Sequence, residues 1–187
     1  MTKFIPLLLA GLLATLSAGA QTVKLQTTEG DIRIQLDAEK APKSVANFVQ
    51  YVKAGHYNGT LFHRVIATFM IQGGGFDAKM NQKPTKPPIP LESHNGLANV
   101  RGSIAMARTN DPNSATSQFF INVVDNPMLD GEPDNPASGY AVFGQVIEGM
   151  DVVDKIRAVE VAPHGMHQHF PVKPIFITKA LVEPVKK

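Results

Sequence analysis

The sequence of 187 residues contains no cysteine. This absence excludes disulfide bonds, thiol catalysis, cysteine-based metal sites and attachment of a lipid to a cysteine. The hydrophobic core alone must therefore hold the fold together. With 43% apolar and 18% charged residues, the composition is that of a chain that buries such a core. The length fits one ordinary domain.

Several catalytic signatures are also missing. The sequence has no G-x-S-x-G, no H-E-x-x-H, no P-loop and no G-x-G-x-x-G motif. Gly73-Gly74-Gly75 is a bare glycine triplet, which indicates only a close approach of backbone. These absences argue against a hydrolase and against a nucleotide-binding enzyme.

The chain has little excess charge of either sign, with 18 lysines and arginines against 16 acidic residues. Removal of the first 20 residues would delete only Lys3 among them, which leaves 18 − 1 = 17 cationic side chains against 16 anionic ones. A formal charge near +1 predicts no nucleic-acid partner.

The N-terminus has the three parts of a secretory signal peptide. Lys3 supplies a positive start, Phe4 to Leu16 is mostly apolar, and Ala18-Gly19-Ala20 offers a cleavage site of small residues. The apolar run is shorter than the roughly 20 residues that a membrane-spanning helix needs, which disfavours a retained anchor. We therefore expect residues 1–20 to be cleaved and residues 21–187 to form one exported domain without a membrane anchor.

The spacing of apolar residues predicts a mainly β domain with two helices. Alternation predicts a hairpin over Val23–Thr28 and Asp31–Leu36, and apolar residues at helical spacing predict a helix over Pro42–Ala54, closed by Gly55. Further strands are expected in Leu61–Gly75, Gly102–Ala107, Phe119–Val123, Tyr140–Ile147 and Ile175–Val182, a short helix in Gly149–Ile156, and loops in Asp77–Asn99, Arg108–Ser117, Asn126–Gly139 and Val159–Pro171. About eight short strands without a repeat or linker favour one antiparallel barrel whose open ends the helices cover.

Two segments concentrate aromatic and long apolar side chains beside a few polar ones, namely Leu61–Gly75 and Ser117–Val123. Most phenylalanines in such strands belong to a core. Arg64 is harder to explain by packing. No acidic residue lies near it in sequence to form an ion pair, and an arginine among apolar residues can instead lie at the mouth of a pocket and bind a ligand. We expect the two segments to build one site, an apolar cup with a single cation at its rim.

Three histidines near the C-terminus, His164, His167 and His169, suggest a metal site as an alternative. No fourth ligand is spaced with them, and they lie in a segment rich in turn residues. We therefore expect neither a metal nor another cofactor.

At these positions the chain resembles the cyclophilin family of peptidyl-prolyl cis-trans isomerases. The matching segments occur in the family's order and spacing, and the resemblance extends over essentially all of Val23 to Leu181. They are Phe62–Ile66, Phe69–Gly74, Met106–Ala107, Ser117–Ile121, Leu129–Gly131 and Val142–Gly144. The resemblance implies an eight-stranded antiparallel barrel capped by two helices. Together with the predicted signal peptide, it resembles the bacterial periplasmic branch, which implies a periplasmic location.

The resemblance also implies roles for individual residues. Arg64 would be the catalytic arginine, and the segment Ala107-Arg108-Thr109 would present backbone groups to the peptide. The walls of the proline pocket would be Phe69, Met70, Phe120 and Leu129, and the side-chain hydrogen-bond partners would be Gln72 and Gln118. Met128 stands where many members have tryptophan, which puts tight cyclosporin binding in doubt, and Tyr140 stands where many have histidine and keeps a ring over the proline.

The chemistry implied for this site needs no covalent step. Rotation about an amide bond is slow because the nitrogen lone pair is delocalised, which gives a barrier of about 18 to 20 kcal/mol. A donor aimed at the proline nitrogen stabilises the twisted transition state, where the lone pair is localised, more than the planar ground state. Arg64 is the candidate donor.

The sequence leaves two functions open. The first is a prolyl isomerase that assists the folding of exported proteins, with proline-containing peptides and unfolded exported proteins as partners. The second is a proline-peptide binding module or holdase whose turnover is incidental. For either function we expect a monomer, and we expect weak selectivity for the residue before proline at the shallow surface near Arg108.

Overall fold

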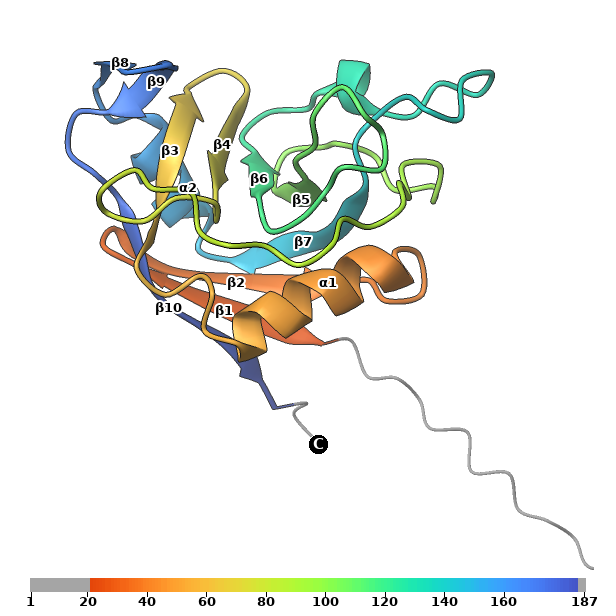
Figure 1. The fold of residues 1–187 in the computed structure, drawn as a ribbon, viewed down its shortest axis with the longest axis horizontal. Coiled ribbons are helices and arrows are strands. Elements are labelled where there is room, and N and C mark those ends of the chain that lie inside the picture. The colour runs from red at the N-terminus through yellow and green to blue at the C-terminus, as the bar shows by residue number, and fades with distance from the viewer. Residues whose placement is uncertain (1–20, 185–187) are drawn as a thin grey trace, which may run out of the picture.

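The computed structural model describes residues 21–184 as one closed barrel with two α-helices (Figure 1). The predicted signal peptide, residues 1–20, lies outside the described residues, as do residues 185–187. The barrel strands are β1 (Thr22–Thr27), β2 (Gly30–Leu36), β3 (Thr60–Ile66), β4 (Met70–Gly73), β5 (Ser103–Met106), β6 (Phe119–Asn122), β7 (Val142–Glu148) and β10 (Phe176–Glu183). The other elements are α1 (Pro42–Lys53), the 3₁₀ helix η1 (Pro127–Leu129), α2 (Met150–Arg157), β8 (Val161–His164) and β9 (His167–Pro171).

All neighbouring barrel strands run antiparallel, in the closed order β1-β10-β3-β4-β6-β5-β7-β2. The alternation of the first hairpin is realised directly, since Val23, Leu25, Ile32 and Ile34 are fully buried between partly or fully exposed neighbours. Closure leaves no free strand edge in the barrel. The predicted fold class is therefore confirmed.

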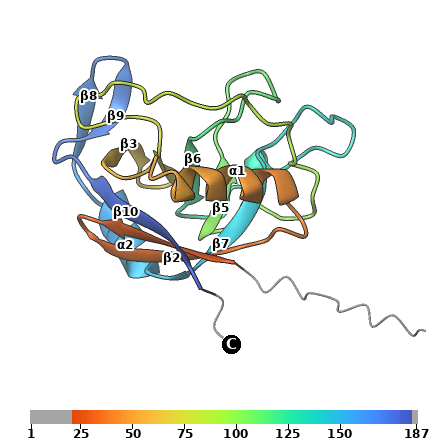
Figure 2. The same cartoon turned by 60° about the horizontal axis from the view of Figure 1, so that its bottom comes forward.

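The first helix begins at Pro42, a residue that suits the first turn because it has no backbone N–H to satisfy. Its N-terminus is capped from a distant loop, where the Glu92 carboxylate accepts hydrogen bonds from the backbone N–H groups of Lys43 and Ser44 at 3.0 and 2.8 Å. Gly55 follows the helix with φ +68°, in the left-handed region that ends helices. Figure 2 shows α1 lying across the barrel strands.

The two helices bury different parts of the barrel. α1 packs against β10 and β7 and buries Phe48, whose ring meets the rings of Tyr57, Phe119 and Phe143 at 5.1 to 5.5 Å between centroids. α2 packs against β2, β3 and β4. None of the helices among residues 21–184 is long and apolar enough to span a membrane.

The segment predicted as a loop over Val159–Pro171 is instead partly a hairpin, so that prediction is wrong. β8 and β9 pair antiparallel in a small separate sheet, with a register irregularity between Ala162 and His164 (Figure 1). The pairing escaped sequence analysis because Pro163, Gly165 and Pro171 interrupt the alternation that indicates a strand. β9 packs against β3, so the hairpin rests on one side of the barrel.

Candidate active site

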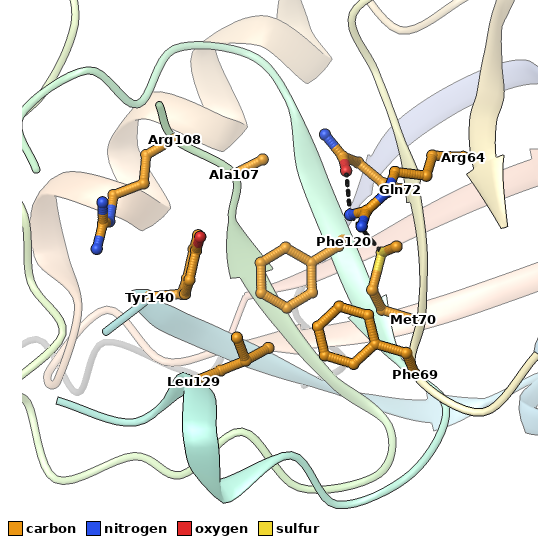
Figure 3. Close-up of a pocket in the computed structure, with 9 residues that line it drawn as sticks. All are labelled: Arg64, Phe69, Met70, Gln72, Ala107, Arg108, Phe120, Leu129 and Tyr140. Carbon is orange, nitrogen blue, oxygen red and sulfur yellow. Dashed lines mark hydrogen bonds between the residues drawn. The ribbon is translucent and has the colours of Figure 1, made fainter. Parts of the chain in front are cut away.

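A pocket of about 180 Å³ opens on the barrel surface beside β3, β4 and β6 (Figure 3). Its lining consists of Arg64, Phe69, Met70, Gln72, Ala107, Arg108, Phe120, Leu129 and Tyr140. Two of these nine residues are cations, and the lining contains no carboxylate and no histidine from the described part of the chain. The site is an apolar recess with positive charge at its rim.

Strand pairing explains why residues far apart in sequence meet here. β4 lies between β3 and β6, and Gln72 is opposite both Arg64 on β3 and Phe120 on β6. Met70 and Gln72 are two residues apart on β4 and both line the pocket, as expected for residues on one face of a strand. Residues of Leu61–Gly75 and Ser117–Val123 therefore line one pocket.

The pocket floor is a small apolar cluster separate from the main core. Met70, Ala105, Phe120 and Val142 are its buried members, and Phe69, Leu129 and Tyr140 are among the half-buried residues that pack on it. Phe62, His63 and Ile71 are buried and are not part of the pocket lining, as expected for supporting core residues. The Phe120 and Tyr140 rings meet edge to face, with 5.6 Å between centroids.

Arg64 is half-buried at one side of the pocket and makes only weak contacts with its neighbours. Its Nη1 lies 3.4 Å from Gln72 Oε1 and 4.0 Å from Met70 Sδ, and its guanidinium carbon is 6.0 Å from the centre of the Phe69 ring (Figure 3). The ion pairs found among residues 21–184 all involve other cations. The charge of Arg64 is thus available to a ligand.

The side chain of Gln118, which is not part of the pocket lining, holds the side chain of Gln72 in place. The Gln72 side-chain amide donates to Gln118 Oε1 at 3.0 Å, which leaves Gln72 Oε1 facing Arg64. Gln118 fits because residue 75 is glycine, since a Cβ at Gly75 would lie 2.6 Å from Gln118 Cγ. Gln118, predicted as a direct peptide contact, lies outside the pocket lining and positions Gln72.

Arg108 brings a second cation to the pocket, where the sequence had suggested a single one. Its guanidinium lies over the Tyr140 ring, 4.7 Å from the centroid. Nε and Nη1 donate to the carbonyl oxygens of Gly139 and Thr109 at 3.0 and 2.9 Å, and Nη2 donates to that of Ala137 at 3.4 Å. Arg108 therefore joins the loop after β5 to the loop before β7 and fixes Tyr140 between them.

Met128 differs from the other predicted pocket residues. It lies in η1 with 72% of its surface exposed, and it is absent from the lining, whereas the adjacent Leu129 contributes to it. The remaining predicted contacts, Phe69, Met70, Gln72, Ala107, Arg108, Phe120, Leu129 and Tyr140, are all brought together by the structure.

A buried asparagine network behind the pocket was not found by sequence analysis. Asn122 Nδ2 donates to Asn99 Oδ1 at 3.1 Å, and Asn126 Nδ2 donates to Asn122 Oδ1 at 2.7 Å. Asn126 also donates to the backbone oxygen of Phe69 at 2.9 Å, and Asn99 donates to that of Leu129 at 3.0 Å. The network ties two pocket walls to each other. Polar residues spread over a strand and two loops give no local pattern that would reveal it.

The histidines considered as metal ligands are engaged in packing or exposed. His164 stacks on Phe170 with 4.8 Å between centroids, and the His167 ring meets those of Phe76 and His63 at 5.1 and 5.4 Å. Residues 21–184 contain no group of at least three histidine, cysteine, aspartate or glutamate residues arranged to hold a metal ion. Burial, followed by the charge of His167, lowers the pKa of His63 to about 4.

The chain is similar to known proteins both in sequence and in fold. The family model for cyclophilin type peptidyl-prolyl cis-trans isomerases matches residues 22–182. A peptidyl-prolyl cis-trans isomerase of Acinetobacter baylyi is 52% identical over 99% of this chain and 98% of its own. Peptidyl-prolyl cis-trans isomerase A of Dickeya dadantii is 56% identical over 86% of this chain and 83% of its own.

A solved structure shares the fold. The crystal structure of a cyclophilin type peptidyl-prolyl cis-trans isomerase from Cryptosporidium parvum, determined in the presence of the dipeptide Ala-Pro, superposes with a TM-score of 0.72 at 28% identity. The match covers 88% of this chain and 99% of that one.

Proposed function

The chain belongs to the cyclophilin family and is a peptidyl-prolyl cis-trans isomerase, and we propose that it acts on exported proteins as they fold, with Arg64 as the catalytic donor. The observation that carries the role of Arg64 is its position. It is the cation of β3 that lines an apolar pocket, with no ion-pair partner among residues 21–184.

The pocket would hold the proline ring while the bond before it turns. Phe69, Met70, Phe120 and Leu129 form an apolar recess that suits a ring without polar groups. That proline-containing peptides are the ligands is supported by the Cryptosporidium parvum relative, whose crystal structure was determined in the presence of Ala-Pro. Once the ring is fixed, rotation at the preceding carbonyl completes the reaction.

Arg64 would supply the differential stabilisation. In the planar amide the proline nitrogen has little basicity, whereas in the twisted transition state its lone pair is localised and accepts a hydrogen bond. A guanidinium N–H aimed at that nitrogen lowers the barrier without proton transfer. Gln72 Oε1, at 3.4 Å from Arg64 Nη1, would restrict the direction of the guanidinium.

The free-energy requirement is modest. Uncatalysed Xaa-Pro isomerisation takes about 10 to 100 s, and turnover in milliseconds requires an acceleration of about 10⁴ to 10⁵, or roughly 5.5 to 7 kcal/mol. A charge-assisted hydrogen bond contributes about 1.5 to 3 kcal/mol, and orientation of the substrate contributes the rest. No cofactor is required in this scheme.

The role of Arg64 is tested with a protease-coupled assay on an Xaa-Pro peptide. We expect Arg64→Ala to lower kcat/KM about 10- to 100-fold, in line with the loss of one charge-assisted hydrogen bond. Arg33→Ala removes an arginine on β2, outside the pocket, and serves as the matched control with unchanged activity. Full activity in Arg64→Ala would remove Arg64 from the mechanism.

Action on exported proteins is supported by the predicted signal peptide over residues 1–20. We expect the mature protein to begin at Gln21 and to be found in the periplasm, which fractionation and N-terminal sequencing would check. We also expect it to accelerate the proline-limited refolding of an exported protein, and Arg64→Ala to lose this effect. If Arg64→Ala lost catalysis but still bound unfolded client proteins as the wild type does, with its effect in the cell unchanged, the holdase function would be favoured over the isomerase.

A further inference from the structure

We propose that Arg108 makes this pocket select proline peptides that carry an acidic side chain next to the proline. The inference rests on the proposed use of the pocket as the peptide site and deepens it. It also revises the expectation that the surface near Arg108 discriminates only weakly between flanking residues. The shallow shape of that surface gives little selectivity, whereas the positive charge of Arg108 gives a preference for acidic side chains.

The first support is the position of the charge. Arg108 and Tyr140 line the pocket on the opposite side of Phe120 from Arg64 (Figure 3). A peptide whose proline ring rests on Phe120 therefore extends past Arg64 on one side and past Arg108 on the other. The Tyr140 ring stands between Phe120 and the Arg108 guanidinium (Figure 3), so a peptide that continues past Tyr140 carries the side chain next to its proline toward that guanidinium.

The second support is that the charge of Arg108 is oriented but not neutralised. The carbonyl oxygens of Gly139, Thr109 and Ala137 accept its hydrogen bonds, and carbonyl groups carry no net charge. The ion pairs within the described range, residues 21–184, do not include Arg108. A guanidinium has five N–H groups, so about two remain for a ligand after these three bonds.

The third support is preorganisation. Stacking on Tyr140 at 4.7 Å and three backbone contacts hold the guanidinium before any peptide arrives. An arginine that is already ordered loses less conformational entropy on binding than one that is free in solution. A carboxylate therefore meets a fixed donor pair, whereas an ammonium group is repelled by both arginines of the lining.

The size of the effect follows from Coulomb's law. A unit charge about 7 Å from Arg108 in a water-like dielectric changes the affinity about threefold. Replacing glutamate by lysine in the peptide turns the attraction to Arg108 into a repulsion of similar size. We therefore expect kcat/KM ratios of about three to ten in favour of the glutamate peptide. Salt at about 1 M shortens the screening length to about 3 Å and should bring the ratio close to one.

The test measures isomerisation by exchange NMR, which needs no coupling protease, on peptides that differ only in a glutamate, glutamine or lysine before or after the proline. At the position facing Arg108 the wild type should turn over the glutamate peptide three to ten times more efficiently than the lysine peptide. Arg108→Gln should bring this ratio close to one at that position, because the expected three- to tenfold preference comes from the charge of Arg108. Arg108→Lys should keep most of the ratio.

Lys179→Gln removes the same charge from an exposed position on β10 and should leave the ratio unchanged. The proposal would be overturned if the wild type and Arg108→Gln had the same ratio of kcat/KM for the glutamate and lysine peptides, both before and after the proline. It would also be overturned if Arg108→Lys lowered this ratio as much as Arg108→Gln. Turnover of the neutral glutamine peptide tests the isomerase pocket separately. If the wild type did not turn over the glutamine peptide, the proposed function would be contradicted. If it turned over the glutamate, glutamine and lysine peptides with equal kcat/KM, only the role of Arg108 would be contradicted.

Discussion

At the scale of single residues, the fold strongly lowers the pKa of His63. Its side chain is 3% exposed on β3, packed against the rings of Phe76 and His167, and its Nδ1 has no hydrogen-bond partner within the described structure. Burial is the main reason that its pKa falls from 6.5 to about 4. The folded protein therefore resists protonation at a position where the unfolded chain accepts a proton.

This shift predicts a loss of stability in mild acid. Between pH 6.5 and pH 4 the unfolded state binds more protons at His63 than the folded state, so the free energy of unfolding falls as the pH falls through this window. A shift of this size corresponds to about 3 kcal/mol below pH 4. Urea unfolding of the wild type at pH 7.5 and pH 4.5 should show a difference of about 2 to 3 kcal/mol from this residue.

His63→Phe, which keeps an aromatic ring but cannot be protonated, should show a smaller pH difference than the wild type. His169→Gln removes an exposed histidine and should retain the wild-type difference. Equal pH dependence in the wild type and His63→Phe would contradict the assignment.

Residue types were easier to predict from sequence than side-chain directions. Pattern alone indicated only a pocket with Arg64 at its rim, and the resemblance to the cyclophilin family assigned Phe69 and Phe120 to its walls. Gln118 and Met128 were expected beside the peptide, but whether a side chain points into a pocket depends on neighbours that are distant in sequence. Gln118 is directed to Gln72 by the space above Gly75, and Met128 projects outward from a single helical turn.

At the scale of elements, the asparagine network links β6, η1 and the turn between β3 and β4. Asn122 stands at its centre, fully buried, with hydrogen bonds to Asn99, Asn126 and Ser103. Two of these partners hold the backbone of the pocket walls Phe69 and Leu129. Polar groups thus align these elements in addition to the apolar cluster that they share.

Asn122→Ala should therefore lower both stability and substrate binding. The change removes the donor to Asn99 Oδ1 and one of the two acceptors of Asn126 Nδ2. A buried polar group that loses its partner costs about 1 to 3 kcal/mol, so we expect a loss of about 2 to 4 kcal/mol in urea unfolding. KM should rise more than kcat falls, because the pocket walls loosen while Arg64 remains on β3.

The matched control is Asn110→Ala, at an exposed asparagine, which should leave unfolding and KM near wild type. If Asn122→Ala lost stability but kept its KM, the network would support the barrel without positioning the pocket.

Elements with clear periodicity were predicted within a few residues, as for α1 and the β1–β2 hairpin. The β8–β9 hairpin was missed because prolines and a glycine interrupt it and its outward residues are mostly exposed. The Glu92 cap of α1 could not be predicted either, since the carboxylate lies 48 residues from Ser44 in the chain. Periodicity records which face of an element is buried, and it does not record which distant loop completes it.

At the scale of the whole molecule, about eight short strands and two helices made the barrel predictable in outline, and the resemblance implied the same architecture. The strand order was beyond local patterns, because β10 pairs with both β1 and β3 from the far end of the chain. Closure therefore requires long-range contacts, which favour one cooperative folding unit.

We expect activity and stability to be independent of metal ions and of reducing agents. The pocket lining of the described chain offers two arginines and a glutamine as its charged and amide groups and no typical metal ligand set, and the sequence has no cysteine. Peptide isomerisation and urea unfolding should be unchanged, within error, after treatment with EDTA or dithiothreitol. A loss of activity with EDTA that a divalent metal restores would revive the histidine-based alternative.

The first and last barrel strands end beside each other. Thr22 on β1 is the register partner of Glu183 on β10, and both views show these strand ends close together (Figures 1 and 2). A short linker could join them, and the chain could then be opened at the exposed β8–β9 tip, Gly165-Met166, without cutting a barrel strand. The enzyme is thus suited to circular permutation and to insertion into another protein, with its pocket still open to peptides.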